Sequence, residues 1–230
     1  MITKFKSALL AAGIALSAGS MIAAAPASAQ VNGIATTEPA VVIARAAART
    51  AAYNQINTTY SAQLTQLTQY RQEMQTLQQS LDTDKDNQLS QAEIDANPTV
   101  VQQIQAKEQQ IQQASQPIVM AQYFVIEQIL GELVNARTQV ISSKGIQLMI
   151  APDAIQYAPP QIDVTSDIVA ALDQRLPTVS TTVPANWQPR QSTVQMQQAV
   201  QQVLVLAAQQ QAAQQAAQQQ GAAGGNVEGR

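Results

Sequence analysis

Two long helical patterns, separated by a short acidic segment, constrain the fold of this chain more than any other feature. Helical periodicity runs over about 39–81 and again over about 98–143, with residues 82–97 between them. Helices joined by so short a connection must fold back on each other as an antiparallel hairpin. At a rise of about 1.5 Å per residue, each arm would be about 60 Å long. The rest of the chain cannot enclose arms of that length, so we expect a protein that acts through an extended surface.

The first arm carries a narrow apolar stripe whose members follow alternating steps of three and four residues. They are Tyr53, Ile56, Tyr60, Leu67, Tyr70, Met74, Leu77 and Leu81, with only Gln63 breaking the series. The second arm carries a β-branched residue every seven positions, at Ile104, Ile111, Ile118 and Val125. Such a stripe packs against one partner helix. The other faces are rich in Gln and Thr, which indicates either a plain structural hairpin or a surface for varied apolar or extended clients. Pro117 predicts a kink or a flexible point.

The second arm becomes apolar on all sides toward its end, which predicts burial on several sides in a compact body. These residues are Tyr123, Phe124, Val125, Ile126, Ile129, Leu130, Leu133, Val134, Val140 and Ile141. Gly145 is a suitable residue to end the helix. Strands are expected at Val31–Thr36, Ile146–Ile150 and Ile155–Tyr157, and then a short helix capped by Asp163 or Thr165 and stopped by Pro177. The predicted fold class is α+β, mostly α, with a long antiparallel helical hairpin on a small β-strand body.

The first 29 residues have the pattern of a secretory signal peptide. Lys4 and Lys6 precede an apolar run from Ala8 to about Ala25, and Ala27-Ser28-Ala29 forms an A-x-A cleavage site. We expect cleavage after Ala29 and export of the product that begins at Gln30.

Composition excludes several classes of function. The chain has no Cys and no His, which removes disulfides, thiol chemistry and the usual general bases and metal ligands. Removing Lys4 and Lys6 with the signal peptide takes the formal net charge from −3 to −5. DNA, RNA and anionic membranes are therefore poor partners, and membrane contact would be peripheral at most. We do not expect an enzyme.

The segment between the arms resembles an EF-hand calcium loop. Asp82, Asp84 and Asp86 occupy positions 1, 3 and 5; the carbonyl of Gln88 would serve at position 7, Ser90 stands at 9 and Glu93 at 12 as the bidentate ligand. Asn87 stands where glycine is usual, and Asn reaches the left-handed conformation more readily than most residues. The spacing favours weak calcium binding; the alternative is an acidic, well-solvated turn. No other cofactor is expected.

The last part of the chain differs in composition from the rest. Residues 177–189 form a Pro/Thr-rich linker that contains Trp187, and residues 191–230 are rich in Gln and Ala. The weakly apolar centre consists of Val200, Val203, Leu204 and Leu206. Composition permits a helix to about Gln219 and a Gly-rich tip. We expect a loosely attached or disordered tail, with a partner-binding helix as the alternative.

The segment that follows the second arm resembles a known family. Residues 145–158 (GIQLMIAPDAIQYA) and 161–168 (QIDVTSDI) are similar to the C-terminal signature of the Skp/OmpH family of periplasmic chaperones. The order of signal peptide, strand, helical hairpin, strands and closing helix also matches.

The resemblance covers residues 30–176, in which residues 30–38 and 144–176 would form the body. Residues 177–230 are a linker and tail outside the resemblance. It implies a homotrimer in the periplasm whose small β body carries helical tentacles. These would hold unfolded outer-membrane proteins without ATP and prevent their aggregation before membrane insertion. The alternative function is a structural or calcium-responsive coiled-coil protein of the cell envelope.

Overall fold

The structure is a computed structural model that describes residues 33–224, with side chains described to residue 218. Contacts divide the chain into Met1–Gln30 and Val31–Arg230, and the described residues belong to the second unit. The predicted signal peptide and its cleavage site lie outside the described residues. The elements are β1 (Ile34–Thr36), α1 (Pro39–Arg45), α2 (Ala47–Thr59), α3 (Ser61–Leu81), α4 (Gln91–Ala96), α5 (Pro98–Lys144), β2 (Leu148–Ile150), the short 3-10 helices η1 (Pro152–Ala154) and η2 (Pro160–Ile162), α6 (Thr165–Arg175) and α7 (Gln191–Gly224).

The first helical segment consists of three helices, where the sequence predicts one. At Ala46 the backbone is extended (φ −54°, ψ 128°), and at Tyr60 it leaves helical geometry (φ −104°, ψ 22°). The break at Ala46 turns α1 so that it packs against α6 and α7. The amide of Ala47, left without a helical partner by this break, donates to the Asp173 carboxylate at 2.8 Å. A tertiary contact therefore stabilises the interruption.

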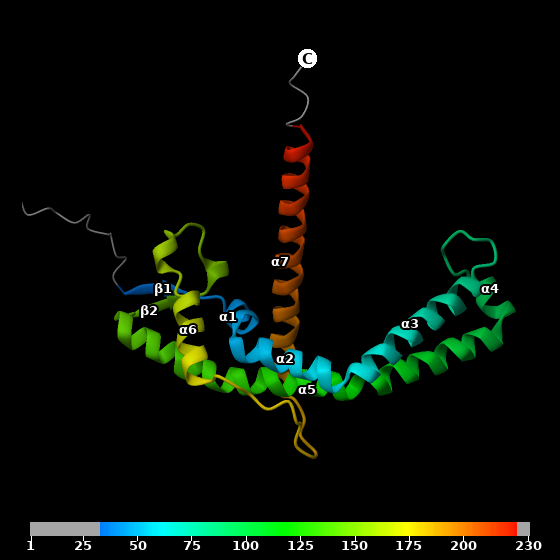
Figure 1. Ribbon diagram of the computed structural model, residues 1–230, viewed down its shortest axis with the longest axis horizontal. Coiled ribbons are helices and arrows are strands. Elements are labelled where there is room, and N and C mark those ends of the chain that lie inside the picture. Colours follow the sequence, from blue (N-terminus) through cyan, green and yellow to red (C-terminus); the bar gives the residue numbers. More distant parts are fainter. Residues whose placement is uncertain (1–32, 225–230) are drawn as a thin grey trace, which may run out of the picture. The chain divides into compact units, whose positions relative to one another are not determined.

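Helix α5 runs for 47 residues and passes through Pro117 without a break. It ends at Gly145, whose φ of 64° is the left-handed conformation expected of a residue that terminates a helix. Its first part lies beside α3, and its later part contacts α2, α6 and α7 (Figure 1). Most of the apolar residues predicted to be buried are packed there, with Val125, Ile126 and Ile129 wholly buried. The prediction is wrong for Val134, which is 53% exposed.

Two short strands form a parallel sheet close to the end of α5. In the β1–β2 pair, Ile34 aligns with Leu148 and Thr36 with Ile150. The Thr36 hydroxyl donates to the Ile150 carbonyl at 2.8 Å, which fixes the last pair of the ladder. We use "body" for β1, α1, β2, α6 and the part of α5 from residue 118 onward.

The third predicted strand, Ile155–Tyr157, does not form. This segment is irregular and lies between η1 and η2, where Pro152, Pro159 and Pro160 offer no amide hydrogens for a ladder. The N-cap residue of α6 is Val164, so the predicted cap at Asp163 or Thr165 is wrong. The Asp163 carboxylate instead accepts from the amide of Thr165, the first helical residue, at 2.9 Å, and so holds the chain one residue before the cap position. The helix ends at Arg175, two residues before Pro177.

The expectation of a loosely attached or disordered tail is wrong for residues 177–204. Val179 and Val183 pack against the core, and α7 contacts α1 and α5. In the first part of α7, Thr193 and Val200 are wholly buried. From Val205 to residue 218 the side chains are exposed, and Figure 1 shows this part of α7 standing away from α5. The helix is therefore docked at one end and free at the other.

Candidate functional site

The α3–α5 pair carries an apolar seam that is closed at both ends and open between them. Leu67 and Ile118 are buried at the end near the body, and Leu81 is buried where α3 ends. Between these levels Leu77 and Ile104 are only partly covered. Apolar side chains that remain partly exposed in a contact between helices can be covered by a further apolar group.

A cavity of about 490 Å³ lies over this open part of the seam. It is lined by Glu73, Thr76, Leu77, Gln103, Ala106, Lys107 and Gln110. The Lys107 ammonium pairs with Glu73 and lies 4.5 Å from the centre of the Tyr70 ring, so the charges at this groove neutralise each other. The groove offers apolar surface bordered by amide and hydroxyl groups, which suits contact with an apolar or extended chain.

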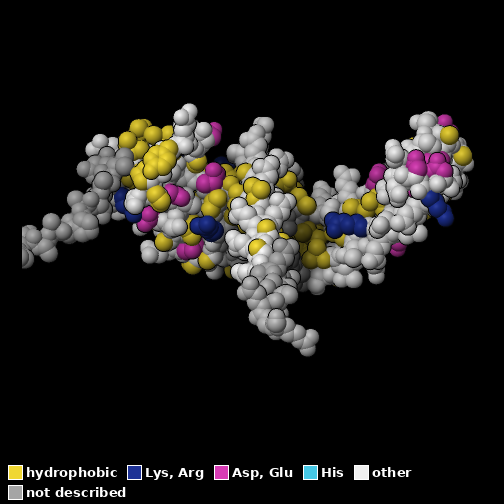
Figure 2. All heavy atoms as spheres, turned by 90° about the horizontal axis from the view of Figure 1, so that it is seen from above, with side chains coloured by type: hydrophobic (Ala, Val, Ile, Leu, Met, Phe, Trp, Pro, Cys, Tyr) yellow, Lys and Arg dark blue, Asp and Glu magenta, His cyan; other side chains and the backbone are white. Residues whose placement is uncertain are grey.

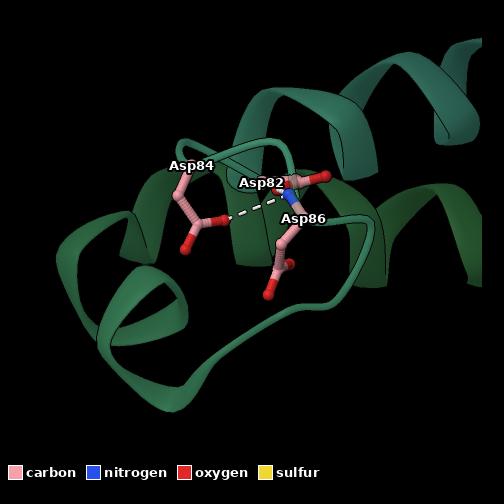
Figure 3. Close-up of side chains that lie close together, drawn as sticks. All are labelled: Asp82, Asp84 and Asp86. Carbon is pink, nitrogen blue, oxygen red and sulfur yellow. Dashed lines mark hydrogen bonds between the residues drawn. The ribbon is translucent and has the colours of Figure 1, made fainter.

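The acidic connection folds around three aspartates at its start (Figure 3). Oxygen atoms of Asp82, Asp84 and Asp86 all lie within 4.8 Å of one another. The Asp86 amide donates to both Asp82 and Asp84, at 3.1 and 3.2 Å. The hydrogen bond from Asp86 favours the charged form of Asp84, but partial loss of solvent and the charges of Asp86, Glu93 and Asp82 outweigh it and raise the pKa of Asp84. The three carboxylates therefore repel one another.

The Glu93 carboxylate makes its own hydrogen bonds and does not join the three aspartates. One carboxylate oxygen accepts from the Thr83 amide at 2.6 Å, and the other accepts from the amide and hydroxyl of Ser90 at 3.0 and 2.8 Å. Ser90 in turn caps α4, and the two residues form a capping box. Hydrogen bonds from Ser90 and then from Thr83 lower the pKa of Glu93 to about 2. The side chain is only 7% exposed.

The structure thus brings together three of the six residues predicted to bind calcium. Asn87 adopts φ 63°, the conformation that the loop requires at that position. The amide of Gln88 donates to Asp86, while Ser90 and Glu93 bond to each other. The aspartates fit a calcium ion, which prefers oxygen ligands. For Glu93 to serve as the bidentate ligand, its bonds to Thr83 and Ser90 would have to break.

We expect the order of this connection to depend on ionised Glu93. Because its pKa in the folded chain lies below the ordinary value of about 4.5, its stabilising contribution is complete above about pH 4.5. The contribution is lost as the pH falls toward 2. Protection of the Thr83 and Ser90 amides from hydrogen exchange, measured relative to the intrinsic exchange rate at each pH, should fall over that interval. Glu93→Gln should lower this protection at neutral pH, since an amide accepts through one oxygen only.

Asp95→Asn provides the matched control, because Asp95 also lies on α4 but is exposed and accepts only from Gln91. Equal exchange rates in Glu93→Gln and in the unsubstituted chain would show that the capping box does not order the connection.

The sheet presents a second candidate surface. Within residues 33–224, β2 pairs with β1 alone, so its other edge is unpaired. Leu148 on this strand is 52% exposed, and Tyr157 in the following irregular segment is 88% exposed. Figure 2 shows apolar side chains gathered over this region and acidic ones over the connection between α3 and α5. An unpaired edge beside exposed apolar groups is a site for association with another chain.

Sequence reasoning missed the residues that fix the tail. The Thr193 hydroxyl donates to the Glu127 carboxylate at 2.7 Å, and Arg190 pairs with the same carboxylate at 3.2 Å. Burial alone would raise the pKa of Glu127, but the bonds from Thr193 and Arg190 bring it below its ordinary value. Farther along α7, the Tyr53 hydroxyl donates to Gln197 at 2.9 Å. The apolar centre at Val200, Val203 and Leu204 was the available signal.

Comparison with known proteins identifies the family. Residues 33–172 match the model of the OmpH family, described as outer membrane protein (OmpH-like). The match covers more than half of the sequence, and the chain belongs to the OmpH-like family. The end of α6, the linker and α7 lie outside the matched residues. A search of curated proteins found no match.

One solved structure matches part of this chain. It is the crystal structure of a proposed outer membrane chaperone (OmpH-like) from Caulobacter crescentus CB15, at 22% identity and a TM-score of 0.40. The similarity covers 65% of this chain and 89% of that one. Because both values are low, family membership rests on the match over residues 33–172.

Proposed function

We propose that this protein is an ATP-independent holdase chaperone of the periplasm that binds unfolded outer-membrane proteins. The observation that carries the proposal is the open seam between α3 and α5, where apolar side chains lie among uncharged Gln and Thr. A surface of this kind can hold many sequences, because apolar contact is non-directional and amide groups can bond to an extended backbone. Family membership and the pattern of the first 29 residues also support this role.

The proposal includes a homotrimer assembled through the body. The sheet has only two short strands, which is too small to be stable on its own in water. The unpaired edge of β2 and the exposed Leu148 and Tyr157 support association of subunits at this place. Three subunits would set three α3–α5 pairs around a shared space, the tentacle arrangement.

Suppression of aggregation of a denatured β-barrel protein, followed by light scattering on dilution from urea, tests the function. The unsubstituted chain should keep the barrel protein soluble. Ala106→Glu places a carboxylate in the groove while preserving helix propensity, so the concentration required for half suppression should rise several-fold. Gln105→Glu adds the same charge one residue away, outside the groove lining, and should leave suppression unchanged.

If the unsubstituted chain does not reduce scattering, the holdase proposal fails and the alternative of a structural spacer in the envelope is favoured. If Ala106→Glu and Gln105→Glu suppress equally, clients bind elsewhere than in the groove.

We also propose that the connection between the arms binds calcium weakly, which would make the protein calcium-responsive. The close approach of Asp82, Asp84 and Asp86 supports this, since a cation would relieve their repulsion. Competition with the capping box should keep the dissociation constant in the range of about 10⁻⁴–10⁻³ M. Calorimetric titration at low salt should show binding that is weakened in both Asp86→Asn and Glu93→Gln. Equal heats in all three proteins would leave the acidic, solvated turn as the correct description.

A further inference from the structure

A break in the first arm and a proline in the second arm lie at the same level. The backbone leaves helical geometry at Tyr60, between α2 and α3, and Pro117 lies within α5. The two residues line one cavity of about 320 Å³, together with Thr181, Thr182 and Val183 from the segment after α6. We call Tyr60 and Pro117 with their neighbouring turns the joint.

The arms should bend more easily at the joint than elsewhere. Pro117 has no amide hydrogen, so the carbonyl four residues before it loses its helical partner, and the proline ring crowds that carbonyl. Tyr60 interrupts the facing helix, so neither helix stiffens the other at this level. The adjacent cavity leaves side chains without close neighbours on one side, and movement there requires little repacking.

Residues 177–190 form a strap along α5, and Thr181, Thr182 and Val183 of this strap line one side of the cavity. Figure 1 shows it as the loop between α6 and α7, passing beside α5. The side-chain amide of Gln128 makes two bonds with the backbone of Ser180: it donates to the carbonyl at 2.9 Å and accepts from the amide at 3.0 Å. At the other end of the strap, the Trp187 ring meets Phe124 edge to face, with centroids 5.1 Å apart. Along the strap, the anchors at Ser180 and Trp187 therefore stand on either side of Thr181–Val183, and both attach the strap to α5.

We propose that the strap restrains the joint and so sets the direction in which α3 and residues 98–117 of α5 leave the body. Thr181 to Val183 line the same cavity as Tyr60 and Pro117, and the strap is fixed to α5 at Phe124 and Gln128, a few turns beyond Pro117. Bending at Pro117 toward the strap would therefore close this cavity and bring the joint against the strap. This segment lies outside the residues that match the family, so the restraint is a property of the extension. Its consequence for clients, the size of the space between tentacles, rests on the proposed function; the restraint itself does not.

Distance measurement between two spin labels tests the restraint without a client. The chain has no cysteine, so Gln102→Cys and Gln174→Cys would place one label on the arm and one on α6, both at exposed positions. Arg175, next to the α6 label, pairs with Glu132 of α5. Glu132 lies 30 residues along the helix from Gln102, so the labels are about 45 Å apart, within range of pulsed electron–electron double resonance. Dilution with unlabelled chain removes distances between subunits. Circular dichroism of each variant verifies that its helices are intact.

With the strap intact, the distance distribution should be narrow. The double variant Gln128→Ala, Trp187→Ala removes both anchors and should broaden it, whereas Gln112→Ala, an exposed glutamine of the same helix, should not. Adding Pro117→Ala to the double variant restores an amide donor and should narrow the distribution again. An unchanged distribution in the double variant, or one that Pro117→Ala leaves broad, overturns the proposal. Aggregation assays on the same proteins report separately on the holdase function.

Discussion

Ending the chain after Pro177 should lower the free energy of unfolding of the body, whereas ending it after Leu206 should not. The shorter protein loses the wholly buried side chains of Thr193 and Val200 and exposes the faces of α1 and α5 that they cover. Burial of one valine side chain contributes about 1.5–3 kcal/mol, so we expect a loss of about 3 kcal/mol or more. Urea denaturation followed by circular dichroism measures it, at one protein concentration because assembly adds to stability.

The longer truncated protein is the matched control. It lacks only residues that are exposed or lie beyond the described side chains, and its urea midpoint should equal that of the full chain. If the two truncated proteins have the same midpoint, the docking of α7 contributes nothing to the body. The longer one should also retain suppression of aggregation, because the seam between α3 and α5 is untouched.

Leu148→Asp should dissociate the proposed homotrimer. The side chain is more than half exposed in one subunit, so aspartate there is tolerated by an isolated chain. In an interface built on the free edge of β2, the same carboxylate would be buried without a partner, which is strongly unfavourable. Sedimentation at micromolar concentration should show trimer for the unsubstituted chain and monomer for the variant, with unchanged helix content.

Gln156→Asp adds the same charge at an exposed position in the neighbouring segment and should remain trimeric. An unsubstituted chain that sediments as a monomer would contradict the proposed assembly, and a trimeric Leu148→Asp would move the interface away from β2.

The helix ends at the connection and at the end of α5 were predictable because local chemistry decides them. Pro98 opens α5 as a first helical residue and Gly145 ends it in the left-handed conformation. The break at Ala46 carries no such signal, since alanine is the strongest helix former; it exists because α1 packs against α6 and α7. The docking of α7 was only weakly indicated, by the apolar residues Val200, Val203 and Leu204, because its contacts depend on Gln197 and Thr193 as well.

The role of Glu93 shows why the candidate site was only partly predictable. A serine followed three residues later by glutamate is the signature of a capping box, and the same spacing joins positions 9 and 12 of a calcium loop. Sequence cannot separate the two. In the folded chain Ser90 and Glu93 form the capping box, while oxygen atoms of the three aspartates lie within 4.8 Å of one another.

The parallel pairing of β1 and β2 has a consequence for the order in which the chain folds. The Thr36–Ile150 contact closes 114 residues, the Glu73–Lys107 contact closes far fewer, and the Thr83–Glu93 contact closes 10. Loop-closure entropy grows with the logarithm of length, so forming the sheet first costs about 2 kcal/mol more than forming the acidic turn first. Once the turn exists, each pair of facing residues on α3 and α5 shortens the loop that remains. The route of least entropy cost therefore pairs α3 with α5 progressively from the acidic turn toward the body, and β1 is the last of these elements to find its partner.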